Sequence, residues 1–236
     1  MLPVNKNLSD NIQDIFAQDN WGNELYNLMI TTEISDNDIV QQFFNSVENG
    51  KFLEIGANDG VDGHTRFLIE KGWSAVYCEP DPYACTRLID NTKSYSDQVT
   101  IVNSAISPGS GPIDFYLAIN GDNMSSYDPA WLDNQFIPEY NKITNMSNRN
   151  PTNTRRIVTN SLSFSELINF VGNDFDLIIT DVEGMDNELI TSIDWQQFTN
   201  TKLIVTEAGE SVAKHLYTTG GFLPLARTKH NMFYYK

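Results

Sequence analysis

The sequence predicts an α/β fold: a mainly parallel sheet with helices on both faces and an antiparallel hairpin at its C-terminal end. The first observation is that short apolar runs, typical of buried strands, alternate with segments of helical periodicity from residue 51 onward. The second is that the last two apolar runs, 222–226 and 232–235, are joined by a short polar turn. Parallel strands need crossover helices and hairpin strands do not, so the final hairpin adds an antiparallel strand.

The residues before the first predicted strand carry weaker signals. We expect residues 1–22 to form a weakly ordered arm, followed by helical signals at 24–30. At Ser35 the string Ser-Asp-Asn-Asp is typical of a helix start, with Asp38 at the third helical position as in a capping box. Apolar residues then recur at helical spacing from Ile39 to Val47, so we expect a helix before the first strand that ends at Gly50.

After residue 50, polar residues precede the predicted helices, and glycine follows several of these helices, as is typical of helix starts and ends. The predicted strands lie at 51–55, 74–78, 99–102, 113–118, 175–180, 203–206, 222–226 and 232–235. The predicted helices lie at 63–71, 82–90, 163–172, 186–192 and 211–218. Pro224 indicates an edge position or a bulge in its strand, because proline cannot donate a ladder hydrogen bond.

One segment, residues 120–159, is too long for an ordinary connection. Its aromatic residues, interleaved with amides and hydroxyls, suit a sugar ring and equally a lid that packs on its own domain; they include Tyr127, Trp131, Phe136 and Tyr140. We expect an N-terminal arm and helix over 1–35 and a single domain over 36–236, with 120–159 as a lid or substrate-binding insertion.

Composition and charge narrow the class of protein. The 236-residue chain is 40% hydrophobic, enough for a full core, and no apolar run approaches the ~18 residues of a membrane-spanning helix. The net charge of −16 disfavours nucleic acid as a partner. The basic group of Arg149, Arg155 and Arg156 is expected on a solvated loop.

The two cysteines and the N-terminal residues indicate the compartment. Cys78 and Cys85 are too few for a disulfide framework and are wrongly spaced for a CxxC redox or zinc pair. The first residues lack the apolar segment of a signal peptide. We therefore expect a reduced, cytoplasmic protein without membrane insertion, whose oligomeric state stays open.

The most informative segment is 53–60, Leu-Glu-Ile-Gly-Ala-Asn-Asp-Gly, where a strand ending in an acid enters a glycine loop. Gly56 and Gly60 allow the backbone to approach a ligand closely. A dinucleotide-binding loop would need glycine where Asn58 and Val61 stand, so a nicotinamide oxidoreductase is disfavoured. An ordinary strand-to-helix turn is the other interpretation of this segment.

A carboxylate after the second predicted strand supports a nucleoside ligand. Glu79 begins the string Glu79-Pro80-Asp81-Pro82 and could accept hydrogen bonds from both ribose hydroxyls. Asp81 is expected to cap the next helix, which begins with proline.

The chain resembles the FkbM-like branch of class I S-adenosylmethionine-dependent methyltransferases. The resemblance spans about residues 50–207 and is carried by 52–60, Glu79-Pro80-Asp81-Pro82, Ser104-Ala105-Ile106, the strand through Phe115, Asn160-Ser161-Leu162-Ser163 and Thr180-Asp181-Val182-Glu183-Gly184-Met185-Asp186. It implies a Rossmann-like sheet with S-adenosylmethionine as cofactor. The implied cofactor-binding residues are Glu54, Gly56, Ala57, Asn58, Gly60, Glu79, Pro80, Ser104 and Ala105.

Known members of this family are mostly O-methyltransferases, so the resemblance implies in-line methyl transfer to a hydroxyl, here expected on a carbohydrate or glycoconjugate. The protein must align the nucleophile and accept its proton. Asp181 is the first candidate for this base and Glu183 the second. In the alternative interpretations, Asp181 only orients its loop and Glu183 only caps a helix. A small natural-product acceptor and a non-catalytic cofactor-binding protein are the alternative functions.

Some features of the site stay open. Some sugar and catechol O-methyltransferases hold Mg²⁺ at the strand ends that correspond to Asp181 and Glu207, but two oxygen ligands are a weak indication, so we predict no metal. His64 is either a base or cofactor contact, or a polar residue at a helix start. The family commonly has lysine where Thr180 stands and Leu-Asp at 162–163. Residues 1–35 and the insertion carry little of the resemblance, so the acceptor is not specified by it.

Overall fold

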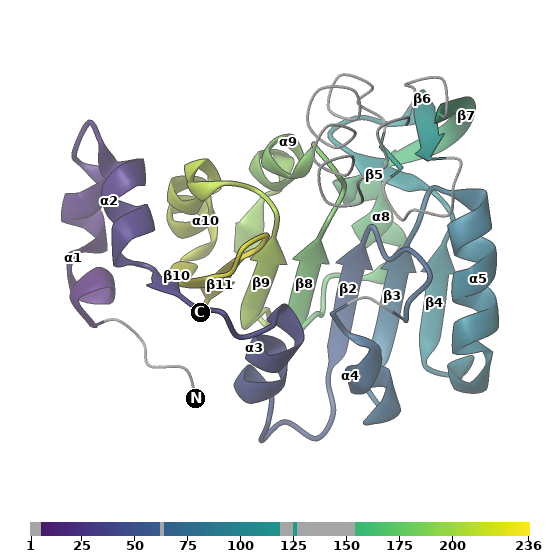
Figure 1. The fold of residues 1–236 in the computed structure, drawn as a ribbon, viewed down its shortest axis with the longest axis horizontal. Coiled ribbons are helices and arrows are strands. Elements are labelled where there is room, and N and C mark those ends of the chain that lie inside the picture. The colour runs from purple at the N-terminus through teal and green to yellow at the C-terminus, as the bar shows by residue number, and fades with distance from the viewer. Residues whose placement is uncertain (1–5, 62–63, 119–124, 127–153) are drawn as a thin grey trace, which may run out of the picture.

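The computed structural model describes residues 6–61, 64–118, 125–126 and 154–236. In these ranges an eight-stranded sheet has the order β1-β10-β11-β9-β8-β2-β3-β4, and a three-stranded sheet has the order β5-β7-β6 (Figure 1). The strands are β1 (Ile30–Thr31), β2 (Lys51–Ile55), β3 (Ser74–Cys78), β4 (Val99–Val102), β5 (Ala105–Ser107), β6 (Gly111–Ala118), β7 (Thr154–Ser163), β8 (Leu177–Thr180), β9 (Leu203–Thr206), β10 (Leu223–Arg227) and β11 (Met232–Tyr235). The helices are α1 (Lys6–Phe16), α2 (Trp21–Leu28), α3 (Asp36–Phe43), α4 (Arg66–Glu70), α5 (Pro82–Thr92), α8 (Phe164–Val171), α9 (Asp186–Ser192) and α10 (Ala213–Gly220), with short 3-10 turns η1 (Lys93–Tyr95), η4 (Trp195–Gln197) and η5 (Glu210–Val212).

Three helices have polar N-cap side chains at the positions that the sequence predicts. The Ser35 hydroxyl accepts the backbone N–H of Asp38 at the start of α3. Asp81 caps α5 in the same way. Ser163 and Glu166 form a reciprocal capping box at the start of α8. These contacts satisfy N–H groups that have no partner within their own helix, so they set the first residues of these helices.

The central sheet is mainly parallel. β2 pairs in parallel with β3 on one side and with β8 on the other, while β11 runs antiparallel to both β9 and β10. The chain builds β2, β3 and β4 outward, then returns to the other side of β2 for β8 and β9. Ligands of such Rossmann-like sheets bind where the strand order reverses, at the carboxyl ends of β2 and β8.

Alternate side chains of each strand enter different cores. Phe52 of β2 packs with α3, α4 and α5, together with Tyr77 and Val205. Leu53 of the same strand lies in the other core, which contains the buried residues of α1, α2, α8, α9 and α10. Both faces of the sheet are therefore covered, as the near-continuous apolar strands predict.

The N-terminal segment corrects our prediction of a weakly ordered arm. Residues 6–16 form α1, and the side chains of Leu8, Ile12, Ile15 and Phe16 are buried. The Phe16 ring lies 5.2 Å from the ring of Trp21 in α2, between ring centroids. The prediction was wrong because these four apolar residues already have helical spacing, which forms one stripe along the helix.

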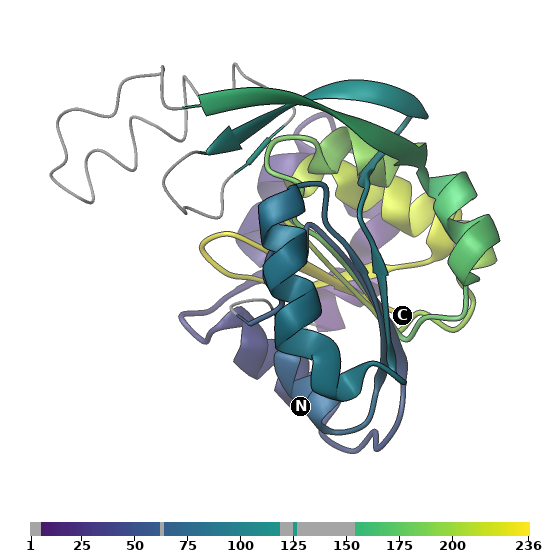
Figure 2. The ribbon, with the colours of Figure 1, turned by 90° about the vertical axis from the view of Figure 1, so that its right-hand side faces the viewer.

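The strand predicted at 113–118 is β6, but it joins the small sheet and does not extend the central one. Residues 154–159, predicted as part of the insertion, belong to β7. Of the rest of 120–159, only 125–126 fall within the described residues. Figures 1 and 2 both place the small sheet at the end of the central sheet where β2, β3 and β8 end.

The C-terminal hairpin contains the bulge that Pro224 predicts, because the pairing of β10 with β11 shifts between Pro224 and Ala226. β10 is not an edge strand, since β1 pairs with it in parallel. Among the described residues, no helix has the length and apolar character needed to cross a membrane.

Candidate functional site

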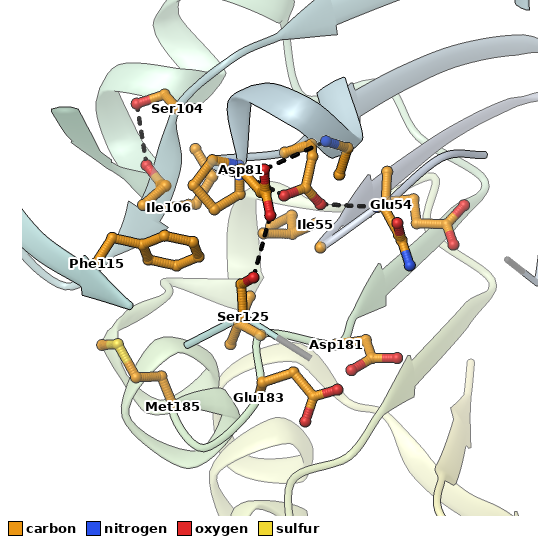
Figure 3. Close-up of a pocket in the computed structure, with 18 of the residues that line it drawn as sticks. Glu54, Ile55, Asp81, Ser104, Ile106, Phe115, Ser125, Asp181, Glu183 and Met185 are labelled. Atoms are coloured by element: carbon orange, nitrogen blue, oxygen red, sulfur yellow. Dashed lines mark hydrogen bonds between the residues drawn. The ribbon is translucent and has the colours of Figure 1, made fainter. Parts of the chain in front are cut away.

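A cavity of about 720 Å³ lies at the carboxyl ends of β2, β3, β8 and β9 (Figure 3). Residues of the small sheet, among them Ile106, Phe115 and Leu117, form an apolar part of its wall, whereas the strand ends of the central sheet contribute mainly polar groups. The volume is in the range of small-molecule and cofactor sites.

The glycine loop after β2 packs directly against the segment after β8. Gly56 has φ +86°, and a Cβ there would lie 1.7 Å from the carbonyl oxygen of Asp181. The backbone N–H of Asp181 donates to the carbonyl of Ile55 at 2.9 Å. Only glycine fits this contact, which brings the loop and the acid after β8 to the same place.

Not all of the loop residues that were predicted to bind the cofactor line the cavity. Ala57 and Asn58 line the cavity, but Gly60 does not. Gly60 has φ +68°, and a Cβ there would lie 2.5 Å from Leu88 Cδ1 of α5. Gly60 therefore turns the loop toward α5 and does not itself face the cavity.

Glu54, the last acid of β2, is buried beneath this loop. Its carboxylate accepts the hydroxyl of Thr65, which also lies 3.1 Å from the Tyr77 hydroxyl. Burial raises the pKa of Glu54, and the nearby His64 partly opposes that shift. These contacts connect β2 to the start of α4, and Glu54 is also among the residues that line the cavity.

Glu79 joins two segments at the cavity wall. Its Oε2 accepts the backbone N–H of Asn58 at 2.7 Å, and its Oε1 accepts the backbone N–H of Asp81 at 2.7 Å. Burial raises the pKa of Glu79 to about 7, although both hydrogen bonds act in the opposite direction. Each carboxylate oxygen can accept more than one hydrogen bond, so Glu79 could still accept from a ligand.

Pro80, Ser104 and Ala105 also line the cavity. The Ser104 hydroxyl lies within hydrogen-bond distance of two carbonyl oxygens, those of Ala105 at 3.2 Å and Asn160 at 2.9 Å. It therefore connects the start of β5 to β7 across the small sheet.

Three acidic residues meet at the ends of β8 and β9. Thr180 and Thr206 are paired in register, so Asp181 and Glu207, one residue further on, extend toward the same side of the sheet. Glu183 has φ +51°, which turns the chain after β8. Carboxylate oxygens of Asp181, Glu183 and Glu207 all lie within 4.8 Å of one another. Figure 3 shows Asp181 beside Glu183.

Burial and mutual repulsion both act on this acidic cluster, which we define as Asp181, Glu183 and Glu207. Burial raises the pKa of Asp181 well above its ordinary value, with further increases from Glu207 and Glu183. Burial likewise raises the pKa of Glu183 to about 8 and that of Glu207 to about 7. Asp186, at the start of α9, adds negative charge beside both glutamates. Near neutral pH the cluster can therefore exchange protons.

Thr180, where the family commonly has lysine, does not line the cavity. It is fully buried, and its hydroxyl donates to the Thr206 hydroxyl at 2.7 Å. Because side chains alternate along a strand, Thr180 and Asp181 point to opposite faces. With threonine in place of lysine at position 180, two uncharged hydroxyl groups, those of Thr180 and Thr206, form a hydrogen bond between β8 and β9.

Sequence reasoning missed Asp36 and Asn231 as cavity residues, and it left the role of His64 open. The amide of Asn231 donates to Asp36 Oδ2 at 3.0 Å, and His64 Nδ1 lies 4.0 Å from the same oxygen. His230 and Arg155 also line the cavity, and Arg155 lies in strand β7 and not on the solvated loop that the sequence predicted for it. The first residue of α3 and the turn before β11 meet here because β1, which precedes α3, pairs with β10, a pairing that no local sequence signal specifies.

A cavity at the switch point of a parallel sheet, with a glycine loop after the first core strand and a buried acid after the next, defines the class of Rossmann-like proteins that bind nucleoside cofactors. Residues 54–218 match the family described as the methyltransferase FkbM domain. The chain belongs to this family and is an S-adenosylmethionine-dependent methyltransferase.

Solved structures with remote similarity include three methyltransferases. Precorrin-6y C5,15-methyltransferase from Geobacter metallireducens has 14% identity and a TM-score of 0.39, with 84% of each chain covered. TrmK from M. capricolum, in complex with S-adenosyl-homocysteine, has 9% identity and a TM-score of 0.40, over 87% of this chain and 70% of that chain. A SAM-dependent methyltransferase from Agrobacterium tumefaciens has 8% identity and a TM-score of 0.42, over 85% of this chain and 62% of that chain. None of the curated proteins matches the sequence.

Proposed function

We propose that this methyltransferase transfers a methyl group to a hydroxyl of a carbohydrate or glycoconjugate, with a carboxylate of the acidic cluster as the base. The observation that carries the proposal is that the glycine loop and the acidic cluster share one cavity and pack against each other through Gly56 and Asp181. A reacting methyl group held by the loop would lie next to the cluster.

The residues around the cavity suit S-adenosylmethionine. Glu79 would accept the ribose hydroxyls, and the loop of Gly56, Ala57 and Asn58 would hold the methionine portion. The adenine ring would pack between Pro80 and the start of β5, where Ser104 and Ala105 lie. When bound, this cofactor supplies a methyl group activated by the sulfonium.

The acidic cluster would then act on the acceptor. Asp181 or Glu183 would take the proton of the acceptor hydroxyl while the hydroxyl oxygen bonds to the methyl carbon. The bound cofactor would supply that methyl group, and its sulfur would be the leaving group, in line with the attacking oxygen and with the electron pair of the broken bond. A base is most effective when its pKa lies near the working pH, as the pKa of about 8 at Glu183 does.

The charge of the protein favours a neutral acceptor. Seven acidic side chains line the cavity, against two arginines: Asp36, Glu54, Glu79, Asp81, Asp181, Glu183 and Glu207, with Arg87 and Arg155. A phosphorylated acceptor or a nucleic acid would be repelled there. The apolar wall around Phe115 also suits the alternative acceptor, a small natural product with a hydroxyl group.

The first test is calorimetric titration with S-adenosylhomocysteine. Gly56→Ala and Glu79→Ala should each weaken binding at least tenfold, because one displaces the loop and the other removes the ribose acceptor. Gly109→Ala is the matched control, since a Cβ at Gly109 meets nothing within 4 Å. Binding that is equal in all variants would overturn the assigned cofactor site.

The second test is methyl transfer to a panel of sugars and small hydroxylated compounds. Asp181→Asn and Glu183→Gln should lower kcat while S-adenosylhomocysteine binding persists. A protein that binds the cofactor but methylates no member of a broad panel, with or without these substitutions, would favour the non-catalytic alternative.

A further inference from the structure

We infer that Ser126 is a positioning residue for methyl transfer: its buried hydroxyl holds the main chain of Glu183 and so sets where the Glu183 carboxylate lies in the cavity. The inference rests on the proposed function, in which a carboxylate of the acidic cluster takes the proton of the acceptor. It also assigns a role to residues 125–126 of the predicted insertion.

Ser126 reaches Glu183 from the small sheet. Its side chain is fully buried, and its hydroxyl donates to the carbonyl oxygen of Glu183 at 2.6 Å. The backbone of Ser126 pairs with Tyr116 of β6 through two hydrogen bonds, of 2.8 and 3.1 Å. Because β6 itself pairs with β7 along its whole length, the Ser126 hydroxyl is held by a sheet.

The main chain of Glu183 has a conformation that needs such support. Its φ of +51° lies in the left-handed region, which is disfavoured for a residue with a Cβ. Asp181 is held differently, since its backbone N–H donates to Ile55 and its carbonyl packs against Gly56. Glu183 lies two residues further on, beyond the end of β8, so the hydrogen bond from Ser126 supports a turn that the central sheet does not hold.

The Glu183 carboxylate depends on this main chain for its position. Among the described residues, burial and the negative charges of Glu207 and Asp186 raise the pKa of Glu183, and no hydrogen bond contributes. Negative neighbours repel the carboxylate and cannot anchor it. The position of the carboxylate therefore follows from the turn that Ser126 holds.

Ser125, the preceding residue, connects the same segment to the cofactor side of the cavity. Its hydroxyl donates to Asp81 Oδ2 at 3.1 Å, and Figure 3 shows Ser125 between Asp81 and Glu183. Asp81 in turn caps α5 and donates its backbone N–H to Glu79. Two consecutive serines thus link the wall that would bind the ribose to the turn that carries the proposed base.

This link matters for the reaction because in-line transfer depends on the spacing of base, acceptor hydroxyl and methyl group. A displacement of about 1 Å can lower the rate about a hundredfold. Without the Ser126 hydroxyl, the turn at Glu183 can relax out of the left-handed region and carry the carboxylate away from the methyl group.

The test compares Ser126→Ala with Thr201→Val, since each removes one buried hydroxyl that donates to a backbone carbonyl. Thr201 donates to the carbonyl of Phe175 at 2.8 Å, near the amino ends of β8 and β9 and away from the cavity. With an acceptor from the sugar panel, Ser126→Ala should lower kcat at least about tenfold and leave KM and S-adenosylhomocysteine affinity within about twofold. Thr201→Val should leave all three within about twofold.

Crystal structures of both variants with S-adenosylhomocysteine provide a readout that needs no acceptor. Glu183 should lose its positive φ and its carboxylate should leave the acidic cluster in Ser126→Ala, but not in Thr201→Val. If circular dichroism shows that Ser126→Ala does not fold, Ser126→Cys, with a weaker donor in place of the hydroxyl, replaces it in both comparisons.

An unchanged kcat in Ser126→Ala would overturn the inference, and so would a Glu183 that keeps its conformation there. An equal loss of kcat in Thr201→Val would also overturn it, because the effect would then be a general loss of stability. A parent protein that methylates no member of the panel would contradict the proposed function, while the two crystal structures would still decide whether Ser126 positions Glu183.

Discussion

Two opposing effects act on the charge of Glu79: its hydrogen bonds favour the carboxylate, and its burial disfavours it. Glu79 is 6% exposed and accepts two backbone N–H groups from segments that follow different strands. A neutral side chain could not hold both as strongly, because hydrogen bonds to a carboxylate are about twice as strong as neutral ones. Yet burial disfavours the charge and raises the pKa of Glu79 to about 7. The residue therefore connects the stability of the loop to pH.

The role of Glu79 predicts how the stability of the protein depends on pH. The folded protein holds the Glu79 proton up to about pH 7, whereas in the unfolded chain the proton leaves near the usual value of 4.5. The free energy of unfolding should therefore fall as pH rises from 4.5 to 7, by at most about 1.4 kcal/mol per pH unit from this one proton. Below and above this window Glu79 adds no slope.

Urea denaturation of the cofactor-free protein between pH 4.5 and 8 provides the measurement. Glu79→Gln should show a shallower fall in unfolding free energy than the parent protein over this window. Glu48→Gln, an exposed acid away from the cavity, is the control and should follow the parent. A Glu79→Gln curve parallel to the parent's would show that Glu79 does not carry the proton.

At the scale of elements, α1 shows how a short helix becomes part of the core. Four of its side chains enter the apolar core that also contains Leu216 of α10. The main chain at its end is also held, because Lys214 Nζ donates to the carbonyl of Phe16 at 3.0 Å. An 11-residue helix is marginal by itself, so these contacts are what stabilise it.

Ile12→Ala should therefore lower the free energy of unfolding by about 2–4 kcal/mol, because Ile12 is only 3% exposed and its loss leaves a cavity. Asp14→Ala, on the exposed side of the same helix, should change it by less than about 0.5 kcal/mol. Urea denaturation at one pH compares the two. Equal stabilities would mean that α1 does not belong to the folded core.

Several elements follow the local sequence closely. α9 and β9 have the predicted bounds 186–192 and 203–206, because the patterns of apolar and polar residues that predict them are local. The helix predicted at 63–71 is observed only as α4, and α3 ends at Phe43, well before the Gly50 that ends the apolar periodicity. Helix length depends on which faces find a partner, so periodicity alone overestimated both.

At the scale of the whole molecule, charge should distinguish the cofactor from its product. S-adenosylmethionine has one positive charge more than S-adenosylhomocysteine, at the sulfonium. A chain of net charge −16 with an acidic cavity attracts that charge from all sides. Salt screens such attraction over about 10 Å at 0.1 M.

Raising NaCl from 20 to 500 mM should therefore weaken S-adenosylmethionine binding several-fold more than S-adenosylhomocysteine binding. Calorimetry of both ligands at the two salt concentrations measures the ratio of their dissociation constants. A ratio that does not change with salt would mean that the acids of the cavity do not act on the sulfonium.

The sequence alone determined the alternation of strands and helices from β2 to β11 in the central sheet, the caps of α3, α5 and α8, the glycine loop and the family. These features depend on neighbours within a few residues, or on a motif read along the chain. It also indicated Asp181, Glu183 and Glu79 as site residues, an assignment that still awaits experiment.

Only the tertiary structure decided how these parts meet. Asp181, Glu183 and Glu207 form one cluster because β8 and β9 are neighbours in register, and Asp36 meets Asn231 because β1 pairs with β10. The small sheet of β5, β6 and β7 likewise depends on pairing between distant residues. Strand pairing is set by packing across the whole sheet, and burial and repulsion among the acids exist only once that packing has formed.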